Sequence, residues 1–228
     1  GRSCPTVGIA GSTLGGGIGV LARAYGLSCD HLQAAHVVSA DGDVHTVNSN
    51  HNADLLWALR GGGGGNAAIV TDFTFSTVPA PKVTVFSLQF PPGWTARVLV
   101  AWSSWMRTAP HRLTSVCHVN AAAAPTNRIT GTWTGSTTGL SAQLAGFIAE
   151  VGVDPTSRRT RTYGYLDAMK YFAGCLSKTE AECHPDTQPG GVLGRESFRA
   201  ASRMVERILT AATAGTIVDL MSRRAAWS

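Results

Sequence analysis

The stretch that decides the fold is Ser3-Cys4-Pro5-Thr6-Val7-Gly8-Ile9-Ala10-Gly11-Ser12-Thr13-Leu14-Gly15-Gly16-Gly17-Ile18-Gly19. A second glycine cluster, Gly61 to Gly65, follows farther along the chain. Glycine gives the backbone access to positive φ and lets another group approach the main chain closely. Two such clusters indicate a close backbone approach at both places, as suits a pyrophosphate held by amide groups. The alternative is that the glycines form only a flexible loop.

A hairpin is predicted between the two glycine clusters. His36 to Ala40 and Asp43 to Val47 read as strands, and Asp41-Gly42 is a strong turn signal between them. The two strands should therefore be antiparallel neighbours. Further predictions for this region are helical turns within Ile18 to Leu27, a short helix from Leu55 to Leu59 with its N-cap at Asn52-Ala53-Asp54, and a strand from Ile69 to Val78.

A domain boundary is predicted at Pro79-Ala80-Pro81, because two prolines one residue apart end a strand and form a stiff extended joint. Beyond it, the patterns predict strands over 83–90, 113–121 and 128–134 and helices over 95–106, 139–151 and 198–211, with a further helical stretch shortly before Ser228. We therefore predict an α+β fold with one domain over residues 1–80 and a second over residues 81–228.

Composition limits the class of protein. The chain has 228 residues, of which 44% are hydrophobic, so it has enough apolar side chains for a globular core. Only 14% are charged and 26 are glycine, which argues against coiled coils and helical solenoids. The formal net charge is +5, but the basic residues are scattered from Arg2 to Arg224, so the case for nucleic acid is weak. The sequence contains no run of about 18 apolar residues, so it predicts no membrane span. The histidines do not have the spacing of a zinc site, so no metal site is predicted from them.

A nucleotide-binding turn of the Rossmann type is a weaker alternative. Gly17, Gly19 and Ala22 form a formal G-x-G-x-x-A pattern. That fingerprint requires a buried strand directly before it. The residues from Gly8 to Leu14 are small and polar instead, so an NAD-dependent dehydrogenase is not favoured.

The five cysteines leave alternatives open. Cys4 is either a buried or disulfide-bonded thiol or a reactive one. Cys175 and Cys183 lie in a polar loop, where they form a local disulfide, remain two free thiols, or supply half a metal site through Cys183-His184. A disulfide closing so short a loop contributes about 2 kcal/mol and is typical of an oxidising compartment. If it forms, the protein is expected to be exported; otherwise the compartment is unknown.

The opening stretch resembles the flavin segment of the berberine-bridge-enzyme-like FAD-linked oxidases, in the vanillyl-alcohol oxidase superfamily. The resemblance continues in the same order through three further runs: Tyr25-Gly26-Leu27 with Asp30, Leu56 to Asn66, and Ile69-Val70-Thr71. It implies that residues 1–80 are the C-terminal half of a PCMH-type FAD-binding domain. Residues 81–228 would then be part of a substrate domain, an antiparallel sheet backed by helices. An N-terminal part of the FAD domain and a C-terminal return segment are expected outside this chain.

The resemblance also implies FAD held by two covalent bonds. Cys4 would form a thioether to C6 of the isoalloxazine ring, and an upstream histidine would form the second bond. The backbone at Thr6 to Gly11 would pack along the flavin and ribityl chain, Gly15 to Gly19 would run by the pyrophosphate, and the amides near Ile69 would hold the adenosine. The full set of implied contact residues is Cys4, Thr6, Val7, Gly8, Gly11, Ser12, Gly15, Gly16, Gly17, Gly19, Gly26, Asp30, Ile69 and Val70.

Three positions depart from the family pattern. Ser12 stands where plant members have a histidine, and His31 stands where asparagine is common. Asn66-Ala67-Ala68 replaces the usual Asn-Phe-Gly, and alanine at 68 loses easy access to positive φ. In the second domain, Tyr163, Tyr165 and Trp133 either line a pocket or are ordinary core and rim aromatics.

The implied activity is that of an FAD-dependent oxidoreductase. Such an enzyme removes a hydride from a C–H bond next to oxygen or nitrogen and passes it to flavin N5, and in oxidases O2 then reoxidises the flavin. Alcohols, sugars and amines are the substrate classes, and the base is expected beyond Ser228. We expect the isolated 228-residue fragment to bind FAD poorly and to be inactive. The alternative is a non-catalytic truncated remnant or a binding module of the same fold.

Overall fold

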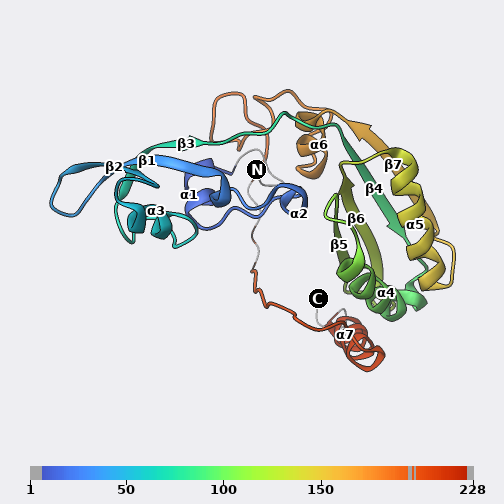
Figure 1. Cartoon of the computed structure of the whole chain (residues 1–228). Helices are drawn as coiled ribbons and strands as arrows, with labels where there is room; N and C mark the ends of the chain where they lie inside the picture. The colour runs from blue at the N-terminus through green and yellow to red at the C-terminus, as the bar shows by residue number, and fades with distance from the viewer. Residues whose placement is uncertain (1–6, 195–196, 198, 225–228) are drawn as a thin grey trace. The chain divides into compact units, whose positions relative to one another are not determined.

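The structure is a computed structural model of the whole chain, and it describes residues 7–194, 197 and 199–224 (Figure 1). The chain divides into two compact units: unit 1 comprises Gly1–Pro81 and Gly164–Arg195, and unit 2 comprises Lys82–Tyr163 and Glu196–Ser228. Each unit combines helices with one antiparallel sheet, which confirms the α+β prediction. In the described part of the chain, no helix has the length and apolar character needed to cross a membrane. The functional assignment of the two domains stays a prediction.

Unit 1 contains a three-stranded sheet in the order β2 (Val44–Asn48), β1 (Leu32–Val38), β3 (Ile69–Phe75). The predicted hairpin is confirmed, because β1 and β2 are antiparallel neighbours with Val38 opposite Val44. Residues of the turn itself stabilise it: Gly42 has a φ of 88°, and the Ser39 hydroxyl donates a hydrogen bond to the Asp41 carboxylate. β3 pairs with the other edge of β1 and ends at Phe75, earlier than the sequence predicted.

The helices of unit 1 are short: α1 (Ile9–Leu14), α2 (Ala22–Tyr25), α3 (Ala53–Leu59) and α6 (Tyr165–Phe172). α3 confirms the predicted helix before the second glycine cluster. Its N-cap residue Asn52 is in the left-handed conformation, and its side chain donates to the carbonyl of Thr46 instead of capping. The buried core of unit 1 consists of Leu14, Leu32, Ala35, Val37, Val47, Leu56 and Leu59.

Unit 2 contains a four-stranded antiparallel sheet in the order β5 (Leu113–Asn120), β6 (Thr126–Trp133), β4 (Val83–Gln89), β7 (Ser157–Tyr163). Helices α4 (Thr95–Thr108) and α5 (Thr137–Val151) provide the rest of its core. The ring of Trp105 stacks on Phe147 at 4.6 Å between centroids and also lies against Phe86 of β4. The core therefore lies between one face of this sheet and the helices α4 and α5.

One predicted helix of unit 2 is wrong. The described residues between Arg199 and Thr210 are not helical. The further helical stretch predicted shortly before Ser228 is confirmed as helix α7 (Ala211–Arg224). The apolar side chains that suggested a helix find no core, since Met204 is 94% exposed and Val205 is 69% exposed. Thr210 sets the start of α7, because its hydroxyl accepts a hydrogen bond from the amide of Thr213 at 3.1 Å.

Candidate functional site

The two glycine clusters lie against each other in unit 1. The amide of Gly63 donates to the carbonyl of Leu14, at the end of α1, over 2.8 Å. A methyl group added at Gly61 would lie 3.8 Å from Cα of Gly16. Gly16, Gly61 and Gly63 all have positive φ. The glycines therefore allow backbone to pack on backbone, which a flexible loop would not do.

The first cluster also pairs with the residues that follow α2. The amide of Ser28 donates to the carbonyl of Gly17, and the amide of Cys29 donates to the carbonyl of Gly16, at 3.0 and 3.1 Å. A methyl group at Gly17 would lie 2.5 Å from Cβ of Ser28. Packing within the unit thus requires glycine at position 17, in addition to any contact with a cofactor.

Asp30 and Gly26 support the same turn. The Asp30 carboxylate accepts a hydrogen bond from the amide of Leu27 at 2.7 Å. A methyl group at Gly26, whose φ is 81°, would lie 2.8 Å from that carboxylate. Both residues therefore have an internal structural role, and Gly26 also lines the cavity described next.

A cavity of about 360 Å³ opens in unit 1 beside the glycine segment. Three stretches line it: part of the glycine segment up to His31, the end of β3 with the residues up to Pro81, and Tyr165 at the start of α6. Among the described residues that line the cavity, none is Lys, Arg, Asp or Glu. The cavity is therefore mostly apolar with a few polar groups, which is typical of a small-molecule site.

The polar groups of the cavity are arranged around His31. Its Nε2 lies 2.5 Å from the carbonyl oxygen of Tyr25, and its Nδ1 lies 3.4 Å from the hydroxyl of Ser76. Because a carbonyl only accepts, Nε2 carries the hydrogen. Burial raises the pKa of the Tyr165 hydroxyl, which keeps that phenol protonated and able to donate a hydrogen bond at neutral pH.

The structure brings together only some of the predicted contact residues. Gly17, Gly19 and Gly26 line the cavity. Gly8 and Gly11 belong to the N-cap and first turn of α1, where an added methyl group would meet nothing within 4 Å. The other members of this segment lie nearby in the chain: exposed Val7, buried Ser12, and Gly15 and Gly16 at the end of α1.

Two predicted residues lie elsewhere. Ile69 and Val70 begin β3, whereas the cavity is lined by Phe75 at the other end of this strand. At about 3.4 Å per residue, the two ends are roughly 20 Å apart. One ligand reaches both places only if it is long and extended. Cys4 and Thr6 lie outside the described residues.

Sequence reasoning did not foresee the second wall of the cavity. Phe75, Ser76, Ala80 and Pro81 line it, although the pattern there predicted a strand and a stiff joint. Tyr165 lines it too, which decides one of the alternatives left open for the aromatics. No spacing rule finds these residues, because the fold brings them together from segments far apart in the sequence.

The other aromatics and the alanine departure have structural roles. Trp133 is buried in the core of unit 2 and donates to the carbonyl of Ser136 at 2.7 Å. The guanidinium of Arg161 lies 5.2 Å from the ring centroid of Tyr163. Ala68 is not among the described residues with positive φ, and its half-buried side chain packs against the core of unit 1. Alanine at 68 therefore causes no backbone strain.

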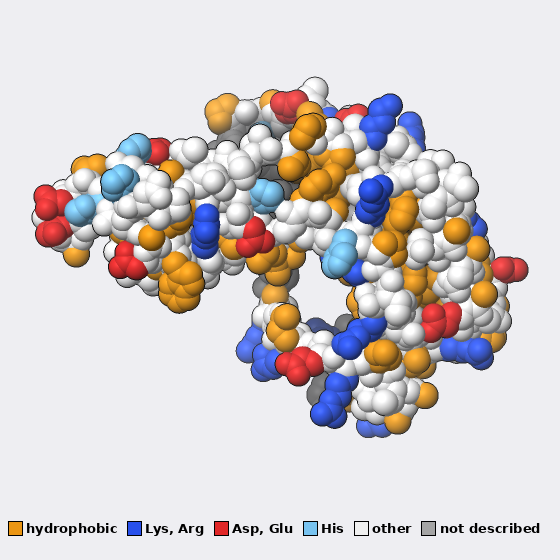
Figure 2. Space-filling model, viewed as in Figure 1, with side chains coloured by type: hydrophobic (Ala, Val, Ile, Leu, Met, Phe, Trp, Pro, Cys, Tyr) orange, Lys and Arg blue, Asp and Glu red, His pale blue; other side chains and the backbone are white. Residues whose placement is uncertain are grey.

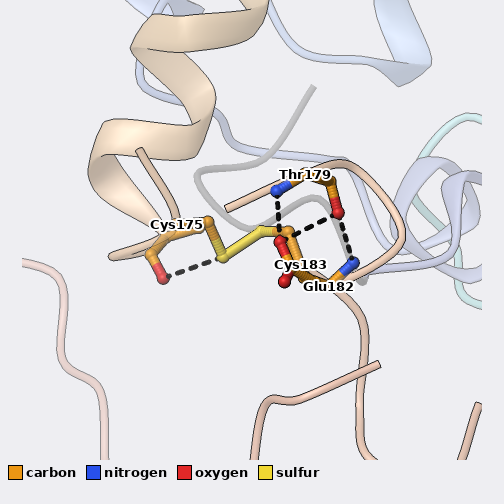
Figure 3. Close-up of a disulfide and its surroundings, with 5 residues drawn as sticks. Cys175, Thr179, Glu182 and Cys183 are labelled. Atoms are coloured by element: carbon orange, nitrogen blue, oxygen red, sulfur yellow. Dashed lines mark hydrogen bonds between the residues drawn. A yellow bond between two sulfur atoms is a disulfide. The ribbon is translucent and has the colours of Figure 1, made fainter. Parts of the chain in front are cut away.

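Cys175 and Cys183 form a disulfide just after α6 (Figure 3). Both residues are buried, and their Cα atoms are 5.7 Å apart. The loop between them is closed by Thr179 and Glu182, because the Glu182 carboxylate accepts from the amide and the hydroxyl of Thr179 at 2.7 and 2.9 Å (Figure 3). The disulfide prediction is therefore confirmed over the two alternatives. Cys29 and Cys117 are free thiols.

Comparison with known proteins identifies the cofactor class. A family model described as "FAD binding domain" matches residues 1–48. The chain is 38% identical over 174 residues to an uncharacterised FAD-linked oxidoreductase, YgaK, of Bacillus subtilis, covering 73% of this chain and 37% of the relative. It is 35% identical over 179 residues to glucooligosaccharide oxidase of Sarocladium strictum, covering 75% and 35%. The chain thus spans little more than a third of the length of these relatives.

Solved structures agree on the fold. The BBE-like 1 protein of Physcomitrella patens matches with a TM-score of 0.79 and 28% identity, covering 97% of this chain and 47% of that one. Glucooligosaccharide oxidase of Acremonium strictum matches with a TM-score of 0.66 and 30% identity, covering 74% and 36%. That oxidase carries a 6-S-cysteinyl, 8α-N1-histidyl FAD. The mixed fold is accordingly that of the PCMH-type flavoproteins.

The residues of unit 1 fit FAD. Gly8, Gly11 and Gly16 leave open space where a side chain would begin, so a ligand has room to approach the backbone there. Among the described buried side chains, the Thr13 hydroxyl in the same helix has no hydrogen-bond partner. The element directly before Gly17 is helix α1, where the Rossmann alternative requires a buried strand, so that alternative is not favoured. The chain is homologous to the berberine-bridge-enzyme-like FAD-linked oxidoreductases and contains part of their FAD-binding domain.

Proposed function

We propose that this chain is part of an FAD-dependent oxidase that acts on a small CH–OH substrate, with carbohydrates as the first class to test. One observation carries the proposal: the FAD-binding match over residues 1–48 coincides with the segment in which Gly8, Gly11 and Gly16 leave open space at the Cβ position and Gly17, Gly19 and Gly26 line the cavity of unit 1. The relatives named as glucooligosaccharide and chitooligosaccharide oxidases favour a sugar over an amine.

The roles of the residues follow from their positions. The backbone from Gly8 to Gly11 would pack along the flavin, with Cys4 as the thioether ligand, and Gly15 to Gly19 would follow the phosphates. Bound FAD would supply a two-electron acceptor for a hydride from the substrate carbon, with a base for the hydroxyl proton and O2 as the oxidant that regenerates the flavin and yields H2O2. The apolar walls of the cavity exclude water from whatever ring it holds.

His31 and Tyr165 are proposed as positioning groups. Both line the cavity, and His31 is held there by hydrogen bonds to the Tyr25 carbonyl and the Ser76 hydroxyl. Side chains that donate or accept hydrogen bonds suit the polar edge of a heterocycle.

Export is proposed for the same protein. A buried disulfide between Cys175 and Cys183 persists in an oxidising compartment and is rare in the cytosol. O2 is the proposed second substrate, and it is available in that compartment.

Anaerobic reduction tests the proposed function. The full-length protein that contains this chain is mixed without O2 with glucose, cellobiose or a chitooligosaccharide, and the flavin absorbance near 450 nm is followed by stopped flow. We expect bleaching by at least one sugar and recovery with H2O2 formation when O2 is admitted. A flavin-loaded protein that no sugar or simple alcohol reduces would contradict the proposal.

A further inference from the structure

Residues 199–210 of unit 2 are extended and exposed, although their sequence predicts a helix. They form the trace that leads to helix α7 (Figure 1). Three large apolar side chains of this segment are open to solvent, since Met204 is 94%, Val205 69% and Ile208 46% exposed. Large apolar side chains that are exposed close together mark an interaction surface. The segment therefore needs an explanation that the proposed flavin site does not give.

Two hydrogen bonds hold the end of this segment on α4. The Nη1 of Arg107 donates to the carbonyl of Glu206 at 2.8 Å, and the amide of Leu209 donates to the hydroxyl of Ser103 at 3.0 Å. Helix α7 follows directly and packs along α4. The exposed apolar side chains are thus attached to the folded part of unit 2, and a partner that binds them is held at its surface.

The apolar side chains of the segment have the spacing of one face of a helix. They stand at positions i, i+3, i+4 and i+7, namely Ala201, Met204, Val205 and Ile208. None of these four side chains belongs to the core of unit 2. An isolated helix of about 12 residues is marginal in water, because most helical stability comes from packing of the apolar face. An apolar surface supplied from outside would therefore convert the extended segment into a helix.

Three arginines lie on the other side of that helix. Arg199, Arg203 and Arg207 are four residues apart, and at about 100° per residue they project away from Met204 and Val205. All three arginines are exposed, and no salt bridge between described residues joins them to a carboxylate. The segment thus combines an apolar side with a basic side whose charge is not neutralised within the chain.

The rest of unit 2 reinforces this positive charge. Glu206 is the one acidic residue in the sequence from 199 to 210, and unit 2 holds 13 Lys and Arg against 5 Asp and Glu. Figure 2 shows Lys and Arg side chains beside exposed hydrophobic ones along the trace that leads to α7 in Figure 1. An anionic surface is therefore attracted to unit 2 and meets apolar side chains at this segment.

We propose that residues 199–210 bind the surface of an anionic lipid bilayer and become helical there. Met204, Val205 and Ile208 enter the boundary between headgroups and acyl chains, while the arginines stay at the level of the charged headgroups. A bilayer fits this segment because it supplies an apolar layer and a dense negative charge together, without a pocket of matching shape. The segment is then an interfacial helix that attaches the protein to a membrane surface.

Vesicle binding by the full-length protein that contains this chain tests the proposal. Vesicles of phosphatidylcholine alone, and of an equal mixture of phosphatidylcholine and phosphatidylglycerol, are sedimented with the protein at low and physiological ionic strength. We expect binding to the anionic vesicles that weakens as salt rises, and binding to the neutral vesicles that is at least roughly 10-fold weaker.

A pair of triple variants separates the segment from the overall charge. R199Q/R203Q/R207Q should lose roughly 10- to 100-fold in affinity for the anionic vesicles, because one basic residue near such a surface contributes about fivefold. The control R112Q/R158Q/R159Q removes the same charge from exposed arginines of unit 2 outside the segment. Its affinity should fall by roughly threefold or less.

Two further variants test insertion and helix formation. M204Q/V205Q/I208Q should lose roughly 10-fold or more in affinity, because its apolar face is removed while all arginines remain. Val205→Pro should lose a similar amount, because proline disrupts the interior of a helix. All of these side chains are exposed, so the variants should fold, and circular dichroism without vesicles checks this.

Four results would overturn the proposal. Equal binding to neutral and anionic vesicles would exclude the charge selectivity, and equal losses in the two arginine variants would exclude the segment. Full binding by Val205→Pro would exclude the helix. A full-length protein that stays in the supernatant with both kinds of vesicle, but binds polyglutamate, would assign the segment to an acidic protein partner. None of these measurements involves the flavin, so they are independent of the proposed function.

Discussion

The amide of Gly63 donates a hydrogen bond to the carbonyl of Leu14 over 2.8 Å, and this bond joins the two glycine clusters of unit 1. The contact shows that the two clusters, although distant in the sequence, pack against each other in unit 1. It also means that the second cluster helps to hold the end of α1, which belongs to the proposed flavin segment, in place. The clusters are thus one structural feature, and the variants below test its parts separately.

Gly63→Ala should destabilise unit 1 by roughly 1–2 kcal/mol, because Gly63 has a φ of 97° that an L-residue adopts only with strain. A methyl group there would also lie 2.8 Å from the side-chain nitrogen of Asn66. Gly64→Ala is the matched control, because its methyl group would make an ordinary 3.6 Å contact with Leu14. Urea unfolding of both variants measures the difference. Equal stability would show that the second cluster has no conformational role.

Gly11→Ala should separate folding from cofactor binding. Gly11 lies inside α1 with open space around its Cβ position, so alanine should stabilise the helix by roughly 0.5–1 kcal/mol. The same methyl group would project toward the proposed flavin, so the flavin content of the purified full-length protein should fall.

Gly146→Ala is the control for this variant. Gly146 lies inside α5 of unit 2 and also has nothing within 4 Å of its Cβ position. It should raise stability by a similar amount and leave the flavin content unchanged. A Gly11→Ala protein with full flavin content would remove α1 from the cofactor site.

Loss of the disulfide should destabilise the chain by about 2–3 kcal/mol on the chain-entropy estimate. The variant C175S/C183S and the dithiothreitol-treated wild type should therefore unfold at the same lower urea concentration. Peptide mapping under non-reducing conditions should recover Cys175 and Cys183 as one linked pair. C117S, which removes a free thiol, should keep the full response to reductant. Identical unfolding with and without reductant would contradict a structural role for this bond.

Cys117 should be a poor nucleophile in the folded chain. Burial raises the pKa of its half-buried thiol to about 12, so at pH 9 only a small fraction of these groups is the reactive thiolate. Because the pKa is raised, the rate of alkylation by iodoacetamide should still be climbing at pH 10. In urea, Cys117 should react as an ordinary thiol. A native rate that levels off near pH 9, followed by mass spectrometry of the Cys117 peptide, would show that the thiol is not buried.

Local chemistry made part of the fold predictable. The hairpin between β1 and β2 depends on Asp41-Gly42, whose turn preference lies within a few residues, and α3 and the helices of the second sheet follow their apolar spacing. β7 was missed because its sequence is mainly Arg and Thr, without the apolar alternation of a half-buried strand. The helix predicted over residues 198–211 failed for the opposite reason, since Met204 and Val205 have apolar spacing but no core to contact.

Only the part of the candidate site that lies in one continuous segment of the chain could be predicted from the sequence. The flavin segment is a run of neighbouring residues, so its glycines stand out in the sequence. The cavity is different, because His31, Phe75 and Tyr165 meet only after the chain has folded.

Covalent flavin on Cys4 tests the central claim most directly. The full-length protein that contains this chain is precipitated with acid, washed, digested and analysed by absorbance and peptide mass spectrometry. We predict that flavin stays with the peptide that contains Cys4, and that Cys4→Ala shifts the flavin spectrum and removes the mass from that peptide, while C29S leaves both unchanged. A colourless purified protein, or a Cys4→Ala protein with an unaltered flavin spectrum, would contradict the claim.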